Sequence, residues 1–338
     1  MDNETALFPM KEEAGLKGLI WGYRFSEDGT AEPLDEAEAS RALERQDSWI
    51  WLHFDLIDGR AREALTRLTV LPDEARDLLL GTDTRQRIET IDHAIAGVIA
   101  DFERADELDA RQMGAWRFCM LSHAFISARR TPLHTMAHVR HALQGGQRMS
   151  GVLHLFDSIV HGFADALTSV SVRMAEQLDE VEDAVIASRD GDDFESLGEV
   201  RRGAVRLRRQ ATPLRSMLHQ LLAKPPAWFT PDAAEDCTEV AQRVASICAD
   251  LEALQERAHA LQDEVFSRQT ETTNRRLMLL SVMSAVLIPP TLISGIFGMN
   301  VDGLPLKDNS PFGFVIAMGM MTVAVVAVLF ALRRLKMI

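Results

Sequence analysis

Charge is absent from two long stretches near the end of this 338-residue sequence, although a quarter of its residues are charged. The stretches cover residues 277–300 and 313–332. At about 1.5 Å per residue, a helix of either length crosses a bilayer core of about 30 Å. Both stretches are predicted transmembrane helices, which excludes a wholly soluble protein.

Basic residues are scarce in the loop between these two spans, where Lys307 stands alone. Cations flank the other ends of the spans: Arg275, Arg276, Arg333, Arg334 and Lys336. This asymmetry places the loop 301–312 outside and both termini, including the basic tail 333–338, in the cytoplasm. The sequence does not open on a basic region followed by an apolar core, so we expect no cleaved signal peptide.

Cysteine is also rare, with only Cys119, Cys237 and Cys248 in the chain. All three lie in the part predicted to be cytoplasmic, where thiols stay reduced. No disulfide is therefore expected.

The sequence lacks a basic surplus. Residues 277–338 contain four Lys/Arg and two Asp/Glu, which leaves 32 against 48, a net charge of −16, for residues 1–276. Such an acidic body argues against nucleic acid as a partner, and it suits either ordinary solubility or the gathering of cations near a pore mouth. No phosphate-binding loop, nucleotide fold or catalytic triad is evident. We expect no nucleotide partner and no enzyme, with ion or proton gradients as the energy source.

The N-terminal part, residues 1–131, is predicted to be an α/β cytoplasmic domain. Short runs rich in β-branched and aromatic residues are typical of strands: GLIWGYRF, SWIWLHFD, RQRIETI, HAIAGVIADF and AWRFCMLSHAFISARR. Between them, DGRAREALTRL and PDEARDLLL read as short helices, with Asp58 as an N-cap and Pro72 at a helix start.

Residues 132–276 are predicted to be helical and to form a funnel or stalk. From residue 232 to 288 the chain has neither Gly nor Pro, which allows one helix of about 58 residues, about 87 Å long, that runs into the first span. Its apolar positions alternate spacings of four and three, the period of a supercoiled seam: Val240, Val244, Ile247, Leu251, Leu254, Ala258, Leu261 and Val265. The partners of this seam are either the preceding helices of the same chain or other subunits.

The first span carries a stripe of small and polar residues. The members recur at three- and four-residue intervals and so share one helix face: Asn274, Leu277, Ser281, Ser284, Ile288, Thr291, Gly295 and Gly298. This stripe is either a close helix–helix contact or the lining of a water-filled pore. Because two spans cannot enclose a channel, a pore requires a cyclic homo-oligomer. Pro289 and Pro290 are predicted to kink the span or loosen one turn.

Gly298-Met299-Asn300, followed by a short loop and a second span with a basic tail, resembles the CorA superfamily of divalent-cation channels and transporters. The resemblance implies an α+β membrane protein with an αβα cytoplasmic domain, a funnel of long helices, two C-terminal spans and a pentameric assembly. Within the superfamily, FGMNVDGLPLKDNSPFGF, RQRIETIDHAIAGVIADF and HAFISARR are similar to the ZntB zinc-transporter branch. Asp302 departs from the Gly that is frequent there and adds a carboxylate at the outer mouth. Phe297 replaces the Tyr that is common in the magnesium channels.

The resemblance also implies roles for particular residues. Gly298, Met299 and Asn300 match the outer ion-selection motif, whose oxygens would hold a still-hydrated cation. The pore-lining positions of the family fall on Asn274, Leu277, Leu280, Ile288 and Thr291. Asn274 would form an inner polar ring, and Leu277 with Leu280 an apolar constriction.

Side chains that zinc prefers occur in the cytoplasmic part. His134, His138 and His141 recur at i, i+4 and i+7 on one predicted helix, which is either a solvated face or a cytosolic zinc site. Cys237 and Cys248 are about three helical turns apart, and each could pair with ligands from another helix or subunit. The pair Asp179 and Asp183 either attracts cations or lies on a solvated surface.

We therefore predict a homopentameric transporter of a bacterial inner membrane, in contact with membrane lipid, that carries Zn²⁺ as its transported ion and has no prosthetic group. A Mg²⁺ (Co²⁺/Ni²⁺) channel is the alternative in the same class. A membrane-anchored coiled-coil scaffold or sensor without transport is the alternative from another class.

Overall fold

The computed structural model describes residues 15–45, 48–187, 193–299 and 312–335. The chain divides into two units, Met1–Leu261 and Gln262–Ile338. The described strands of the first unit form one mixed sheet in the order β2-β1-β3-β7-β6-β5-β4. The strands are β1 (Leu19–Phe25), β2 (Ala31–Leu34), β3 (Trp49–Asp55), β4 (Arg87–Ile91), β5 (Ala94–Phe102), β6 (Met113–Met120) and β7 (Ala124–Arg129).

Each run predicted as a strand contains one, but the last run contains two, because a turn separates β6 from β7. Neighbouring strands pair antiparallel except β3 and β7, which pair parallel. Alternate residues of the sheet face opposite sides, so its two faces have separate cores.

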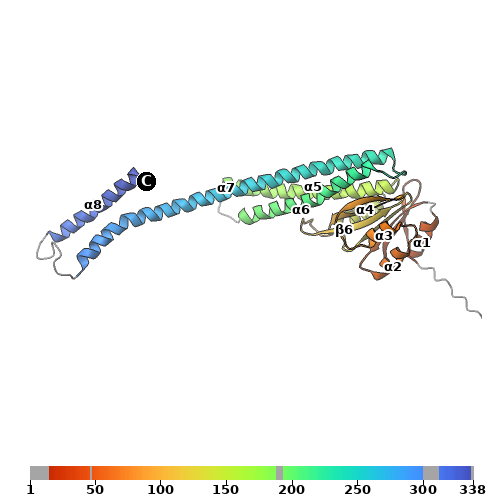
Figure 1. The fold of residues 1–338 in the computed structure, drawn as a ribbon, viewed down its shortest axis with the longest axis horizontal. Coiled ribbons are helices and arrows are strands. Elements are labelled where there is room, and N and C mark those ends of the chain that lie inside the picture. The colour runs from red at the N-terminus through yellow and green to blue at the C-terminus, as the bar shows by residue number, and fades with distance from the viewer. Residues whose placement is uncertain (1–14, 46–47, 188–192, 300–311, 336–338) are drawn as a thin grey trace, which may run out of the picture. The chain divides into compact units, whose positions relative to one another are not determined.

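One face is covered by α1 (Glu36–Arg45), α2 (Gly59–Arg67) and α3 (Asp73–Leu80), which lie together in Figure 1. The prediction for Asp58 is confirmed, since it is the N-cap of α2 and its Oδ1 accepts a bond from Arg60 N at 2.9 Å. Pro72 directly precedes α3. Aliphatic side chains of β3, β5 and β7 and small residues such as Ala61 and Ala75 fill the space beneath these helices.

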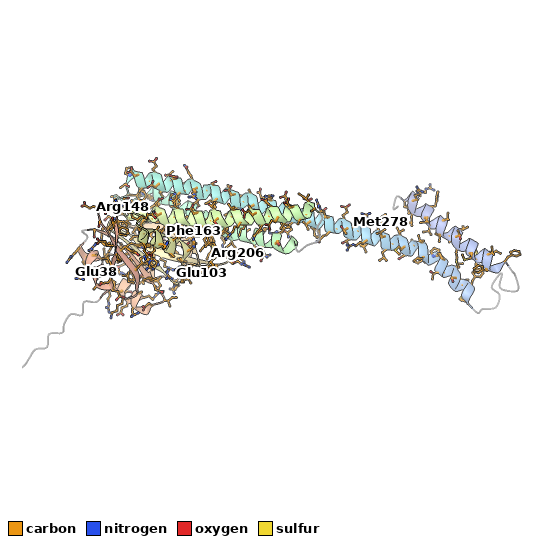
Figure 2. All side chains as sticks on the ribbon, turned by 180° about the vertical axis from the view of Figure 1, so that it is seen from behind. Glu38, Glu103, Arg148, Phe163, Arg206 and Met278 are labelled. Atoms are coloured by element: carbon orange, nitrogen blue, oxygen red, sulfur yellow. The ribbon has the colours of Figure 1, made fainter. Side chains whose placement is uncertain are left out.

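The other face packs against α4 (His134–Gln144), α5 (Val152–Ile186) and α6 (Asp193–Ala223). Aromatic side chains bridge the sheet and α5: Phe118 lies 5.4 Å from Phe156, and Phe102 lies 5.9 Å from Phe163, between ring centroids. Phe163 is labelled in Figure 2. The predicted αβα architecture is therefore confirmed.

The helix α7 (Pro231–Gly298) contains the whole run without Gly or Pro that is predicted as one long helix, and it continues past Pro289 and Pro290. Its predicted seam is buried within a single chain, with Val244 and Leu251 fully covered. Ion pairs from Arg243 to Asp165 of α5 and from Arg208 of α6 to Glu252 join the same helices. Of the two alternatives for the seam, the contact with preceding helices of the same chain is the one observed.

The second unit contains the C-terminal part of α7 and the helix α8 (Gly313–Arg334). These two are the helices, within the described ranges, that are long and apolar enough to cross a membrane. Side chains project from both of them to all sides in Figure 2, where Met278 is labelled on α7.

Candidate functional site

The membrane segment of α7 has a half-buried face and an exposed face. Half-buried side chains recur at three- and four-residue intervals: Val282, Ala285, Val286, Pro289, Pro290, Ile293 and Phe297. On α8, a matching series runs through Gly313, Ala317, Met321, Ala324, Val325, Val328 and Leu332. Within the second unit, the two helices therefore shield each other along these faces.

The predicted polar stripe lies on the opposite side of α7. Every predicted pore-lining side chain is exposed there: Asn274, Leu277, Leu280, Ser281, Ser284, Ile288, Thr291 and Gly295. Even large apolar members stay uncovered, since Leu277 is 56% exposed, Leu280 62% and Ile288 63%. Because α8 packs on the other face, the stripe is free to line a pore or to meet further helices.

Two hydroxyl groups on the stripe, those of Ser284 and Thr291, donate hydrogen bonds to their own helix and leave their oxygens accessible as acceptors. Ser284 Oγ donates to the Leu280 carbonyl oxygen at 2.9 Å, and Thr291 Oγ1 donates to the Leu287 carbonyl oxygen at 2.8 Å. A hydroxyl that donates to its own helix keeps lone pairs for an outside partner. The stripe can therefore present oxygen acceptors to water or to a hydrated cation.

An open groove of about 750 Å³ runs along this part of α7. Ser284, Ile288, Thr291 and Gly295 line it, together with flanking apolar residues and Met299. It contains no charged side chain along its described length, so a cation inside it would meet dipoles rather than a counter-charge.

The helix ends at Gly298, and Met299 N donates to the Ile296 carbonyl oxygen at 3.3 Å just beyond it. Asn300, the third residue of the predicted ion-selection motif, lies outside the described residues, and so does Asp302. Their roles stay predictions.

Three histidines predicted as a possible zinc site do lie on α4. The rings of His134 and His138 are 6.3 Å apart between centroids and nearly parallel, while His138 and His141 are exposed. Burial lowers the pKa of His134, and the neighbouring His138 and Arg104 lower it further. Throughout the described ranges, no three His, Cys, Asp or Glu side chains are placed to hold one metal ion.

Cys237 lies near the start of α7 and is buried, which raises the pKa of its thiol to about 12, with smaller contributions from Asp157 and Asp236. Asp157 is in turn 3.0 Å from His161 Nδ1 on the next turn of α5. His161 is thus held by a side-chain partner, and the same carboxylate raises its pKa.

The predicted acidic pair on α5 is divided. Asp179 forms an ion pair with Arg257 of α7 at 2.7 Å, and Glu182 binds the same guanidinium. Both carboxylates raise the pKa of Arg257. Asp183 is exposed and its backbone oxygen accepts a bond from Ala187 N at 2.9 Å. The sequence did not suggest Arg257, because its partners are more than 70 residues away.

The fold is that of a membrane protein with an N-terminal α/β domain and two C-terminal helices that are long and apolar enough to cross a membrane. Residues 46–334 match the CorA-like Mg²⁺ transporter protein family. Because this match covers most of the sequence, the chain belongs to the CorA-like Mg²⁺ transporter family. The resemblance seen in the sequence is confirmed.

Individual relatives agree with this assignment. The chain is 29% identical over 311 residues to the divalent cation transporter CmaX of Pseudomonas aeruginosa, covering 90% of this chain and 92% of that protein. It is 25% identical to the zinc transport protein ZntB of Pectobacterium atrosepticum, covering 96% and 98%.

Solved structures show the same architecture. Full-length CmaX superposes with a TM-score of 0.82 at 26% identity, over 94% of this chain and 98% of that one. The CorA magnesium transporter of Methanocaldococcus jannaschii superposes with a TM-score of 0.76 over 93% and 98%, and at 17% identity it supports the fold alone.

Proposed function

We propose that this protein transports divalent cations, and Zn²⁺ in particular, across a bacterial inner membrane through the axial pore of a homopentamer. The observation that carries the proposal is the exposed hydroxyl stripe of α7, which lies opposite the face that α8 shields. The membership of the CorA-like family supports transport as the function.

The stripe needs other copies of the chain. A single α7 offers one polar face, and hydroxyl oxygens facing lipid would lack partners in a medium without water. Copies arranged around one axis would turn Ser284, Thr291 and the groove between them toward a shared water-filled path. The backbone bonds of the hydroxyls keep their acceptor oxygens directed at that path.

An uncharged lining suits a cation that keeps much of its water. A divalent ion bound by a carboxylate would leave slowly, whereas hydroxyl and carbonyl oxygens hold its hydration shell weakly enough for conduction. In this proposal, Gly298, Met299 and Asn300 screen ions at the outer mouth, and the acidic body of residues 1–276 raises the local cation concentration at the inner end.

Zinc is favoured by the similarity to ZntB along nearly the whole chain. The alternative is Mg²⁺, for which the family is described, and CmaX is named only as a divalent cation transporter. Uptake of Zn²⁺ and of Mg²⁺ by the same vesicles separates these alternatives. Zinc uptake with and without an imposed pH gradient shows whether protons move with the metal.

Zinc-dye flux into proteoliposomes tests the pore. Thr291→Leu is expected to abolish most of the flux, because it puts a bulky apolar group on every copy of the stripe. Thr322→Leu is the matched control, because Thr322 on α8 is also exposed and makes the same bond to its own helix, to the Met318 carbonyl oxygen at 2.9 Å. Asn300→Ala is expected to remove most of the flux as well.

Equal flux in the Thr291→Leu and Thr322→Leu proteins would overturn the pore assignment. Vesicles without flux for any ion, from a correctly folded wild-type protein, would instead support a scaffold or sensor whose stripe is packed and dry.

A further inference from the structure

Arginines gather on the face of the sheet that α1–α3 cover. Arg117 of β6 pairs across the strands with Val98 of β5, which pairs with Arg87 of β4, so Arg87 and Arg117 point to the same face. Arg130 follows β7 two residues after Ala128, the direct partner of Arg117. The side chain of Arg130 is therefore a diagonal neighbour of Arg117 on that same face.

Arg117 is buried without an acidic partner. It is only 1% exposed, and the bond that the structure gives its guanidinium runs from Nη2 to the backbone oxygen of Asp83 at 2.9 Å. Its Nε is buried and has no hydrogen-bond acceptor among the described residues, and the same is true of Nε and Nη2 of Arg130. Guanidinium groups do not give up their proton in proteins, so these donors remain charged and unsatisfied.

The surrounding charges are mostly of the same sign. Burial lowers the pKa of Arg117 most, and Arg130, Arg87 and Arg62 lower it further, whereas Asp83 is the acid that raises it. The carboxylates of Asp83 and Glu89 are both engaged, since they form ion pairs with Arg87 at 3.0 and 3.3 Å. Arg87 thus has two acidic partners, whereas Arg62, Arg117 and Arg130 form no ion pair with any residue that the structure describes.

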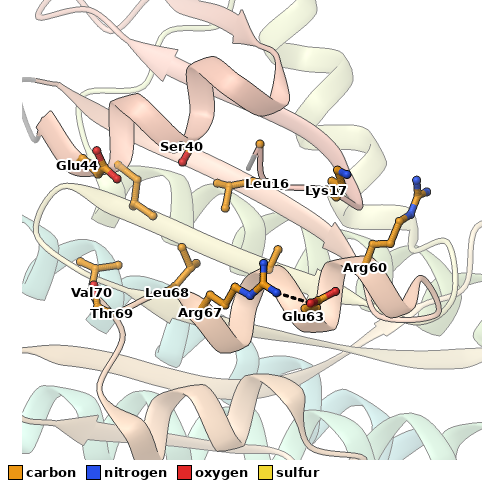
Figure 3. Close-up of a pocket in the computed structure, with 13 residues that line it drawn as sticks. Leu16, Lys17, Ser40, Glu44, Arg60, Glu63, Arg67, Leu68, Thr69 and Val70 are labelled. Atoms are coloured by element: carbon orange, nitrogen blue, oxygen red, sulfur yellow. Dashed lines mark hydrogen bonds and ion pairs between the residues drawn. The ribbon is translucent and has the colours of Figure 1, made fainter. Parts of the chain in front are cut away.

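Other arginines of α2 show the contrast. Arg60 pairs with Asp58 at 2.7 Å, and Arg67 pairs with Glu63, as the dashed line in Figure 3 shows beside a cavity of about 880 Å³ between α1 and α2. A carboxylate one turn or less away satisfies each of them. The absence of a carboxylate partner is therefore specific to Arg62 and its neighbours Arg117 and Arg130.

We propose that Arg62, Arg87, Arg117 and Arg130 form a binding site for a phosphate group, either free or carried by a phosphate monoester. Arginine forks match the oxygens of phosphate and bind them in pairs, and a doubly charged oxyanion supplies the counter-charge that Arg62, Arg117 and Arg130 lack. Arg62, Arg87 and Arg130 are half-buried, which gives the anion a way in from the protein surface. Arg117 forms the floor of the site.

Thermal unfolding and titration calorimetry of the full-length protein in detergent test the site, with inorganic phosphate and glycerol phosphate as probes. Both are compared with chloride at equal ionic strength. Phosphate is expected to raise Tm in a saturable way, because a ligand that binds only the folded state stabilises it. If glycerol phosphate binds more tightly than inorganic phosphate, the natural ligand is a phosphorylated metabolite. If glycerol phosphate binds more weakly, the natural ligand is free phosphate.

Arg117→Met and Arg130→Gln are expected to weaken phosphate binding at least tenfold. Arg117→Met keeps an unbranched stem as far as the position of Nε, and without phosphate its Tm should equal or exceed that of the wild type, because a buried unpaired charge is lost. If it fails to fold, the half-buried Arg130→Gln carries the test alone. Arg60→Gln, an exposed arginine of the same helix α2, is the control and should bind as the wild type does.

Two results would overturn the proposal. One is the absence of any saturable phosphate effect in the wild-type protein beyond that of chloride. The other is wild-type affinity in the Arg130→Gln protein and in any Arg117→Met protein that folds. Neither readout depends on ion transport, so either result would leave the proposed pore unaffected.

Discussion

Asp101 of β5 is expected to make the stability of the first unit depend on pH. Its side chain is fully buried and accepts three bonds: from Phe102 N at 2.8 Å, from Thr135 Oγ1 at 2.7 Å and from Thr135 N at 3.0 Å. The N-cap of α4, Leu133, offers no side-chain acceptor. Asp101 therefore caps α4 from a neighbouring strand.

Burial raises the pKa of Asp101 from 3.8 to about 7, although its hydrogen bonds from Thr135 and Phe102 act in the opposite direction. Between pH 3.8 and about pH 7, the carboxyl group of Asp101 is therefore protonated in the folded state and ionised in the unfolded chain. The contribution of Asp101 to stability is therefore greatest below about pH 4 and falls as the pH rises, until it levels off above about pH 7. Between pH 5 and pH 8 the loss is about 3 kcal/mol, at 1.36 kcal/mol for each unit of proton linkage.

The substitution Asp101→Asn removes this linkage and keeps an acceptor for Thr135 N. Thermal unfolding at pH 5 and at pH 8 measures the effect as the Tm of the variant minus that of the wild type, which cancels the other titrating groups. This difference should increase by roughly 6–12 °C between the two pH values, since a unit of this size shifts by about 2–4 °C per kcal/mol. Asp106→Asn, at an exposed site in the following loop, is the control.

A difference that stays constant from pH 5 to pH 8 would refute the reasoning. It would show that Asp101 is ionised in the folded state throughout this range, and that its bonds to α4 outweigh the cost of burial.

Two further substitutions test the packing of the first unit. Phe163→Ala should lower the unfolding free energy by about 3–5 kcal/mol, because the ring is buried against Phe102 and leaves a cavity; a loss below about 1 kcal/mol in denaturant titration would argue against that contact. Arg257→Gln should cost less than about 1 kcal/mol despite two acidic partners, because all three side chains are 39–60% exposed. A loss of several kcal/mol would show that this ion pair is the main link between α5 and α7.

Much of the fold follows from the sequence because local patterns are strong. Residue period and breakers predict the strands β1 and β3 to β7, the helices α2 and α3, the helical character of residues 132–276 and the two apolar helices at the end of the chain. Neither β2 nor α1 is predicted from the sequence. A signal exists for α1, since Asp35 and Glu38 form a reciprocal capping box in which Asp35 Oδ1 accepts from Glu38 N at 2.8 Å.

Contacts between distant segments could not be predicted. Nothing local specifies that β3 pairs parallel with β7, or that the apolar seam of α7 is covered by α5 and α6 of its own chain. The arginine cluster could not be predicted either, because Arg62, Arg87, Arg117 and Arg130 come together only after the sheet has formed.

The candidate pore could be predicted in part. Spacing alone identifies the stripe from Ser281 to Gly295, because small and polar residues on one face of a span are a local pattern. The spacing does not show which face of the first span packs on α8. In the second unit, the half-buried face of α7 lies opposite the stripe. It also shows that Asp179 is bound to Arg257 rather than free to pair with Asp183.

If the protein conducts ions as we propose, the stripe of α7 faces a water-filled path that the ions follow. Thr291→Cys and the matched Thr322→Cys proteins, reconstituted in vesicles, allow zinc flux to be measured before and after a membrane-impermeant thiol reagent. The three native cysteines are buried, so they react slowly. Flux through the Thr291→Cys protein should fall most of the way to that of protein-free vesicles while Thr322→Cys is unaffected; an equal response of the two proteins would contradict the claim.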